Sequence, residues 1–344
     1  LVGMLLLSYP VWLLGSFSVP FTPWTITAVF AGLTFVNMVL ALSQREALAR
    51  ELRERWKYYL LVELFTLAFF VLFLLVRLGN PDLWHPWKGG EKPMDFSYLN
   101  AVLKSTTFPP YDPWFAGGYI NYYYYGYVIV GVVVKWLGIV PAVAYNLILP
   151  TLFSMLAMGA FSVAWNLLSA SLTRQRVQPG AAVYDFPGGA VRKEPLFAGL
   201  SAAVAMVILG NLGTIRMIWH GIQRLADMQV PFEEANLLTR ISWTFQGLAR
   251  LASGASLPYG PSDWYWIPSR VYPGEPITEF PAFTFLYADL HAHMIALPVT
   301  VLALAWALSV LLGRWGWKGW GHFGVSFLLG GLAIGALRPT NTWD

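Results

Sequence analysis

Long uninterrupted runs of apolar residues most restrict what this chain can fold into. Each run is close to the roughly 20 residues that an α-helix needs to cross a lipid bilayer. Backbone groups within hydrocarbon must be hydrogen-bonded inside the segment, so these runs predict helices. We therefore expect an all-α, polytopic transmembrane helical bundle of about seven or eight spans, forming one transmembrane domain over residues 1–344. The runs lie at about residues 1–19, 24–42, 58–78, 149–168, 196–212, 284–312 and 323–337.

The composition agrees with a membrane protein and excludes several classes of function. Hydrophobic residues make up 57% of the 344 positions and charged residues only 12%, which excludes an ordinary soluble domain. The formal net charge of +4 forms no basic stripe, so we expect no nucleic-acid partner. Because there is no Cys, a metal ion would have to be held by His and carboxylate side chains. The uncharged first residues and the polar motif at the end lead us to expect a fragment of a longer chain.

Charged residues in the short loops predict the orientation in the membrane. The segment 43–57 holds five Arg or Lys beside three Glu, and such loops tend to face the cytoplasm. Loops 170–195 and 313–322 also carry an excess of Arg and Lys, so they are expected on the same side. The first external loop is then 79–118, and the long loop 213–283 is external as well. We expect a multi-pass protein of the plasma membrane, in contact with the lipid bilayer, whose active site is extracytoplasmic.

These orientations hold together only if one of the candidate runs does not cross the membrane. The best candidate is 119–148, where a Tyr-rich start and Pro141 interrupt any long helix. Irregular backbone is tolerated at membrane depth where it lines a cavity, so this segment is predicted to re-enter. The alternative is that 119–137 spans and that loop 170–195 violates the charge tendency.

Both long external loops are predicted to contain helices that lie on the membrane surface. In loop 79–118, Phe96, Leu99 and Val102 fall on one helical face. In loop 213–283, the stretch FEEANLLTRISWTFQGLARL has apolar residues at helical spacing. Such helices would hold the polar loops close to the bilayer.

Asp95 is the strongest candidate for a catalytic residue. It lies just beyond a predicted span, near the start of the interfacial helix and three residues after Lys92. The helix is expected to present this acid to its polar side, where a carboxylate near low-dielectric surroundings can act as a general base toward a hydroxyl. Lys92 and Tyr98 would contribute to substrate binding. The alternative is a carboxylate that only stabilises the positive end of the helix dipole.

The next motif, FPPYDPWFAGGYINYYYYGY, predicts a rigid corner followed by an aromatic wall. Its three Pro residues stiffen the chain and its paired Gly residues permit a sharp turn around Asp112 and Trp114. The four phenols of Tyr122, Tyr123, Tyr124 and Tyr125 cannot all face one way on a helix. We expect these aromatic residues and Asp112 to contact a sugar or a phosphate. The alternative is an interfacial belt, which Tyr commonly provides.

The stretch FLYADLHAHMIALP places three titratable side chains at the start of an apolar run. In an extended conformation Asp289, His291 and His293 alternate and point the same way, which suits a divalent metal such as Mg²⁺ or Mn²⁺. On a helix they would diverge, and a shared metal ion would then not fit. The alternative is a hydrogen-bonded cluster that closes the bundle.

Polar residues near the end of the chain form a further set of candidates. Arg338, Asn341 and Asp344 belong to LRPTNTWD, which follows the last apolar run, and Arg270 and Glu279 lie in loop 213–283. Both Arg side chains have the geometry to hold a phosphate in a bidentate manner. Structural salt bridges and caps are the alternative for all of them.

Three motifs together resemble one known family. They are PMDFSYLNAVLKSTTFPPYDPWFAGGYINYYYYG, ITEFPAFTFLYADLHAHMIALP and RPTNTWD. The combination is similar to an uncharacterised family of very hydrophobic archaeal and bacterial membrane proteins with a Tyr-Tyr-Tyr signature. The resemblance covers roughly residues 58–344 and implies no particular reaction.

A second, more distant resemblance implies a reaction. An acid just outside a span, then an interfacial helix and a Pro-Pro-aromatic corner are similar to the first external loop of GT-C glycosyltransferases, which use lipid-phosphate-linked sugars. The resemblance implies that Asp95 is the catalytic base for inverting transfer of a hexosyl or pentosyl group from a polyprenyl-phosphate-linked sugar to an acceptor hydroxyl. Many of these enzymes carry a second acid beside the first, and here Phe96 stands in that place.

The implied reaction assigns roles to the other candidates. The leaving phosphate needs nearby positive charge, which Arg270, Arg338, a protonated His or a metal ion would supply. The aromatic residues of the corner would stack on the sugar or guide the prenyl chain.

Two other classes of function remain open at this point. One is a transporter, or a structural subunit of a membrane complex, in which Asp289 and the two His form an ion or proton relay. It predicts charged residues spread along several spans. The other is a metal-dependent lipid-processing hydrolase that uses Asp289, His291 and His293. It would tolerate the loss of Asp95.

Overall fold

The computed structural model confirms an all-α polytopic membrane protein. It describes residues 1–84, 90–174, 192–270, 276–312 and 319–343, and within them every regular element is helical. The described chain divides into two compact units. Unit 1 comprises Leu1–Met206 and Ala288–Asp344, and unit 2 comprises Val207–Tyr287. One transmembrane domain over the whole chain therefore stays a prediction.

Within the described parts of the chain, five helical segments are long and apolar enough to cross a membrane. A sixth is obtained if α7 and α8 are counted as one broken span. The number of helices that could span the membrane is below the seven or eight expected. Two of the apolar runs form only short helices, the 15-residue α1 and the 14-residue α5. At 1.5 Å per residue neither covers the roughly 30 Å of a hydrocarbon core. The helices concerned are α1 (Val2–Ser16), α2 (Pro23–Ser43), α3 (Arg45–Gly79), α5 (Tyr124–Leu137), α6 (Pro141–Arg174), α7 (Lys193–Val207), α8 (Leu212–Arg224), α12 (Ala292–Leu311) and α13 (Trp320–Gly335), which leads into the one-turn α14 (Leu337–Thr340).

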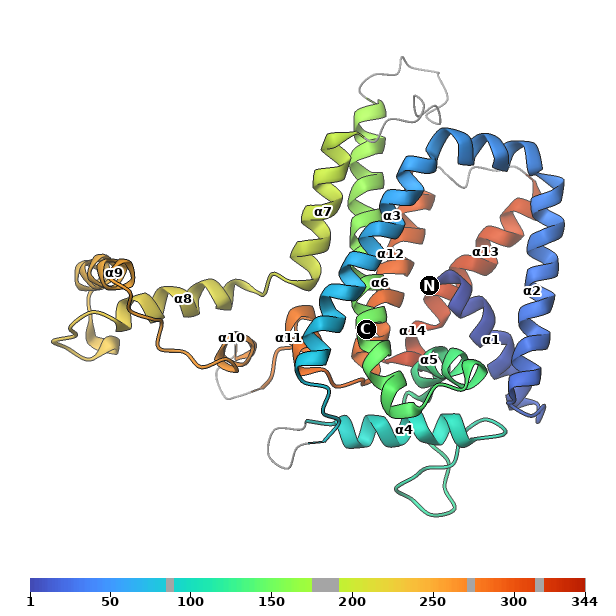
Figure 1. Cartoon of the computed structure of the whole chain (residues 1–344), viewed down its shortest axis with the longest axis horizontal. Helices are drawn as coiled ribbons and strands as arrows, with labels where there is room; N and C mark the ends of the chain where they lie inside the picture. Colours follow the sequence, from blue (N-terminus) through green and yellow to red (C-terminus); the bar gives the residue numbers. More distant parts are fainter. Residues whose placement is uncertain (85–89, 175–191, 271–275, 313–318, 344) are drawn as a thin grey trace. The chain divides into compact units, whose positions relative to one another are not determined.

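The core of unit 1 is a layer of helices packed against α6. Figure 1 shows α3, α6 and α12 side by side, and aromatic rings fill the interface between α3 and α6. Phe73 of α3 stacks on Phe153 of α6 with ring centroids 4.6 Å apart. On the other side, a Cβ at Gly159 of α6 would lie 2.8 Å from Val301 Cγ1 of α12. A side chain at this position would force Val301 or the helices to shift, and small residues are common where membrane helices approach closely.

The described residues between α3 and α6 remain at one end of this bundle. In Figure 1, α3 ends and α6 begins at the lower end, and the helix α4 (Lys92–Lys104) lies across it with α5 beside it. The predicted re-entrant segment 119–148 therefore contains one short helix that does not lead to the other end. Its C-terminal boundary is corrected, since α6 begins at Pro141 and includes the residues up to 148.

Unit 2 is built around two amphipathic helices, α8 and α9 (Leu237–Ala252). Asn211 and Asn236 cap them, each by accepting a backbone N–H of the first turn. A small core of Trp243, Ala226 and Ala235 joins the two helices. The short elements of this unit are η1 (Phe232–Glu234), α10 (Asp263–Trp266), η2 (Ile267–Ser269) and α11 (Pro281–Tyr287).

Candidate functional site

The candidate site lies where α4 crosses the end of unit 1. Asp95 has no exposed surface and shares the buried face of α4 with Leu99 and Val102. The expectation that α4 presents this acid to its polar side was wrong. The spacing i, i+4, i+7 places all three on one face, and that face packs against α5, where a Cβ at Gly131 would lie 3.3 Å from Val102 Cγ1.

The two oxygens of the Asp95 carboxyl have different surroundings. The hydroxyl of Tyr127 donates to Oδ1 at 2.7 Å, whereas Oδ2 is buried and has no hydrogen-bond partner among the described residues. Burial raises the pKa of this carboxyl from 3.8 to about 7, against the opposing effects of Tyr127 and His291. The negative charges of Asp289 and Glu91 raise it further. Asp95 is therefore close to half-protonated at neutral pH.

A buried ion pair ties the start of α4 to the segment before α12. Lys92 Nζ lies 3.1 Å from Asp289 Oδ1, and both side chains are almost fully covered. The backbone N–H of Glu91 donates to Asp289 Oδ2 at 2.8 Å. Both oxygens of Asp289 are thus engaged by residues almost 200 positions earlier, at the N-terminus of the helix that carries Asp95.

Tyr145 of α6 holds the segment that carries Asp289. Its hydroxyl accepts the N–H of Leu290 at 2.8 Å and donates to the carbonyl of Ala288 at 3.4 Å. Ala288 itself has a φ of 64°, a left-handed conformation that is unfavourable for a residue with a Cβ. The phenol therefore stabilises a sharp reversal that brings Asp289 to Lys92.

The predicted metal ligands do not form a ligand set. Among the residues that the structure describes, no three His, Asp or Glu side chains are grouped so that they could hold a metal ion. The extended backbone ends at His291, the N-cap of α12, and His293 already belongs to the helix. Their rings diverge, with centroids 6.0 Å apart at 81°, and Asp289 is engaged by Lys92. This arrangement fits neither Mg²⁺ nor Mn²⁺ bound by the three residues together.

The proline corner has a structural role that is visible in its contacts. Asp112 Oδ1 accepts the backbone N–H of Trp114 at 2.7 Å and that of Phe115 at 3.2 Å, which closes the turn. The exposed Trp114 donates its indole N–H to Ser97 of α4 at 2.9 Å. These contacts fix the corner on α4. Binding of a substrate by Asp112 and Trp114 stays a prediction.

The four consecutive Tyr residues divide between two environments, as expected. Tyr122 is exposed and packs against Tyr123, with ring centroids 4.0 Å apart. Tyr124 accepts the indole N–H of Trp12 at 3.1 Å, and the buried Tyr125 meets the same indole edge to face. Tyr122 is therefore accessible from outside, and the second pair attaches α5 to α1.

The remaining candidates are distributed over both units. Tyr98 packs edge to face on Tyr127, with centroids 6.0 Å apart, so it lies next to Asp95. Arg338 is exposed on α14, which contacts α5, and Asn341 is buried. Arg270 and Glu279 belong to unit 2 and make their described contacts there, with Trp266 and Thr284. Asp344 lies outside the described residues.

Sequence reasoning missed two phenols that organise the site, Tyr127 and Tyr145. Tyr127 stands at the end of the Tyr-rich motif, two positions after Tyr125, and a helical projection would have placed it on the face opposite Tyr125. Tyr145 is a single polar side chain within an apolar run, and nothing in its neighbourhood marks its partner at Leu290.

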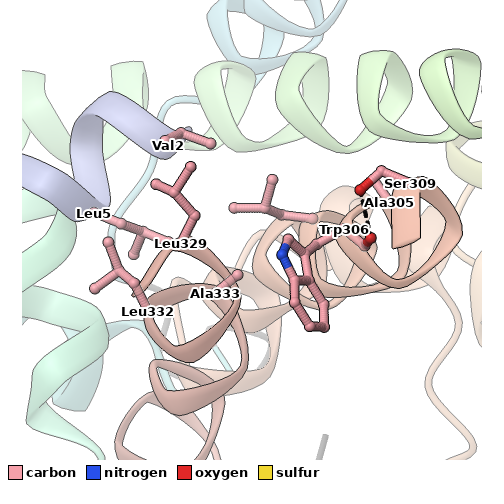
Figure 2. Close-up of a pocket in the computed structure, with 9 residues that line it drawn as sticks. Val2, Leu5, Ala305, Trp306, Ser309, Leu329, Leu332 and Ala333 are labelled. Carbon is pink, nitrogen blue, oxygen red and sulfur yellow. Dashed lines mark hydrogen bonds between the residues drawn. The ribbon is translucent and has the colours of Figure 1, made fainter. Parts of the chain in front are cut away.

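Two apolar cavities adjoin α1 and α13 within unit 1. The larger has a volume of about 570 Å³, is lined by α1, α5, α13 and α14, and includes Trp12, Tyr125 and Gly331. The smaller, of about 230 Å³, is shown in Figure 2, where Val2 and Leu5 of α1 face side chains of α13. The larger volume falls in the range of small-molecule sites, roughly 300–1,000 Å³.

Comparison with known proteins gives one match, to a family model. The family is described as "Uncharacterized membrane protein (DUF2298)", and the match extends over residues 6–344. No curated protein and no solved structure matches the chain. The expected membership of a membrane-protein family is confirmed by this match, which covers nearly the whole chain.

Proposed function

We propose that this chain, which belongs to the membrane protein family described as DUF2298, is a glycosyltransferase of the GT-C type. It would move a sugar from a polyprenyl-phosphate donor to an acceptor hydroxyl at the end of the bundle where α4 lies. The observation that carries the proposal is the buried Asp95 carboxyl, which is oriented through Oδ1 by Tyr127 and has no described partner at Oδ2.

The acid–base properties of Asp95 suit a general base. A catalytic group works best when its pKa lies near the operating pH, and burial raises the pKa of this carboxyl to about 7. The hydrogen bond from Tyr127 fixes the plane of the carboxyl, so that Oδ2 is the oxygen left for a substrate proton. Because Asp95 is fully covered, an acceptor reaches it only after neighbouring side chains move.

In the proposed step, the acceptor hydroxyl displaces the polyprenyl phosphate from the sugar. The acceptor oxygen attacks the anomeric carbon while the bond from that carbon to the phosphate oxygen breaks, and its electron pair leaves with the polyprenyl phosphate. The acceptor proton passes to Asp95 Oδ2. The departing phosphate gains negative charge, which Arg338, exposed on α14 where that helix contacts α5, would stabilise.

Lys92 and Asp289 would act as positioning residues in this reaction. The Lys92 charge is already neutralised by Asp289, so it is a poor partner for a phosphate. The pair instead fixes the first turn of α4, where Asp95 lies, against the start of α12. His291, which interacts electrostatically with Asp95, completes the group of charges around the carboxyl.

The larger apolar cavity supports a lipid-linked donor. Its lining includes Tyr125 of α5, Ala336, which is the N-cap of α14, and Pro339, the residue after Arg338 in α14. A prenyl chain between α1 and α13 would therefore place its phosphate near α14. The Arg-rich start of α3 lies at the opposite end of unit 1 from α4, which supports an extracytoplasmic site at the plasma membrane.

The distribution of charge favours this enzyme over the other two classes. A relay across the membrane needs titratable groups along the spans, whereas Lys92, Asp95, Asp289 and His291 gather at one end of the bundle. A metal-dependent hydrolase needs the ligand set that the described residues do not form.

Lipid analysis tests the proposed donor. Polyprenyl phosphate should co-purify with the wild type and be detected by mass spectrometry of the bound lipid. Gly331→Trp should lose it, because a side chain at this position projects into open cavity space. Gly32→Trp on the surface of α2, where a Cβ also meets nothing within 4 Å, is the matched control and should retain it. Recovery of bulk phospholipid alone would overturn the donor assignment.

A further inference from the structure

A further cavity, in unit 2, is lined by basic side chains. It has a volume of about 570 Å³ and lies along α8, with the η2 turn and the loop around Tyr259 as its other walls. Its described lining includes Arg216, His220, Arg224 and Arg270 and contains no Asp or Glu. This cavity is separate from the residues used in the proposed transfer step.

The basic residues of α8 form a stripe on one side of the helix. Arg216, His220 and Arg224 follow one another at intervals of four, so they lie above one another on the same face. The adjacent face is apolar and exposed, with Leu212, Ile215 and Trp219 among its side chains. This combination of an apolar face and a basic stripe is typical of helices that lie in the headgroup region of a membrane.

Hydrogen bonds hold the walls of the cavity in place. The hydroxyl of Tyr259 donates to the carbonyl of Met217 at 2.6 Å, which attaches the loop to α8. Asn211 caps α8 through Gly213 and donates its amide to the carbonyl of Pro268 at 2.8 Å, which attaches η2. The cavity is thus formed by the fold of unit 2 itself.

Among the residues that the structure describes, no Asp or Glu forms an ion pair with Arg216 or Arg224. Asp227 pairs with Arg250 at 2.7 Å, and Asp263 accepts the backbone N–H of Gly260. Burial lowers the pKa of His220, and the charges of Arg216, Arg224 and Arg240 lower it further. Gathering like charges on one face costs free energy unless an anion is bound. Guanidinium groups are well suited to bidentate contacts with phosphate oxygens.

We propose that this cavity binds a phosphate-bearing ligand through Arg216, Arg224 and Arg270. The ligand chemistry is a phosphate or diphosphate group, which two guanidinium groups one above the other on α8 would hold together. The group could belong to a lipid headgroup or to a soluble phosphorylated molecule. The site is independent of Asp95, so it stands or falls separately from the transferase proposal.

Calorimetric titration of the full chain in a neutral detergent with inorganic diphosphate tests the soluble source. The double variant Arg216→Gln/Arg224→Gln should bind at least about tenfold more weakly, since two charge-assisted hydrogen-bonding groups are removed. Arg216→Lys/Arg224→Lys retains the charge and should keep part of the affinity. Arg250→Gln, which removes one exposed Arg outside the cavity, should bind like the wild type.

Co-sedimentation tests the lipid source with the same variants. If the ligand is a headgroup, vesicles that contain phosphatidylglycerol should bind the wild type more strongly than phosphatidylcholine vesicles, and the double Gln variant should lose this preference. Bound anion should also raise the pKa of His220 toward its ordinary value, as measured by NMR, because it offsets the neighbouring Arg charges. The proposal is overturned if neither probe distinguishes the double Gln variant from the wild type, or if Arg250→Gln is equally impaired.

Discussion

A single carboxyl group, that of Asp95, couples the stability of this bundle to pH. Its pKa is raised from 3.8 to about 7, so between these values the folded chain keeps a proton that the unfolded chain loses. The free energy of unfolding therefore falls as pH rises from about 4 to about 7 and is level above that.

Asp95→Asn should remove this dependence. The variant should gain stability relative to the wild type as pH rises from 5 to 8, by at most about 3 kcal/mol, because about two pH units of this window lie below the raised pKa. The introduced amide has hydrogen-bonding needs of its own, which change the stability of the variant by the same amount at every pH. The informative quantity is therefore how the stability difference between the variant and the wild type changes with pH. The measurement is the difference in thermal midpoint between the two proteins at each pH. A difference that is constant from pH 5 to pH 8 would contradict the raised pKa.

The buried Lys92–Asp289 pair should show strong coupling. Lys92→Met or Asp289→Leu alone leaves an unpaired buried charge and should cost about 3–5 kcal/mol, whereas the double variant should cost much less than the sum. Arg55→Met breaks the partly exposed Arg55–Glu51 pair and should cost at most about 0.5 kcal/mol. Chemical denaturation of the wild type, the two single variants at Lys92 and Asp289 and the double variant gives the coupling free energy between the two charges. Additive costs would show that the two charges do not depend on each other.

At the scale of helices, the contact between α6 and α12 depends on Gly159. Gly159→Ala places a Cβ 2.8 Å from Val301 Cγ1, so the helices must separate or Val301 must shift. We expect a loss of about 1–3 kcal/mol, seen as a lower thermal midpoint. Gly32→Ala on α2 meets open space and should change stability by less than about 1 kcal/mol. Equal midpoints for the two variants would argue against this close approach.

Helices were predicted well from the sequence where a segment lies in the hydrocarbon core of the membrane and must therefore be apolar. The runs for α2 and α13 nearly match their final bounds, whereas the run at 284–312 begins before α12 and includes part of α11. The boundaries of α3 and α6 were missed because both helices continue beyond the apolar run, α3 through the charged stretch from Arg45. Hydropathy detects only the part of a helix that lies in the membrane.

The site was predicted less completely than the helices. Asp95, Lys92, Asp289 and His291 were recognised as candidates because charged groups are unusual beside apolar runs. Their partners were not recognised, since the pairs Lys92–Asp289 and Tyr145–Leu290 join residues far apart in the sequence. Such contacts leave no local pattern, and only the packing of α4 and α6 against the start of α12 creates them.

At the scale of the whole molecule, an active site formed at α4 requires that the chain between α3 and α6 stay on one side of the membrane. The chain has no Cys, so single Cys variants can be labelled without background. Cys at Phe115 and at Leu137, both exposed and on either side of α5, should react with a membrane-impermeant maleimide in intact cells. Cys at Glu46, at the start of α3, should react only after lysis. If the Cys variants at Phe115 and Leu137 were labelled from opposite sides of the membrane, α5 would have to cross it.

The most direct test of the central proposal is the pH dependence of sugar transfer from a polyprenyl-phosphate donor. The wild-type rate should rise with pH and level off above about pH 7, as the Asp95 carboxyl loses its proton. Asp95→Asn should be at least about a hundredfold slower at every pH, since general-base catalysis is lost. Glu46→Gln, which removes a carboxylate at the other end of the bundle, should follow the wild-type profile. An Asp95→Asn variant with the wild-type rate would contradict the assignment of Asp95 as the base.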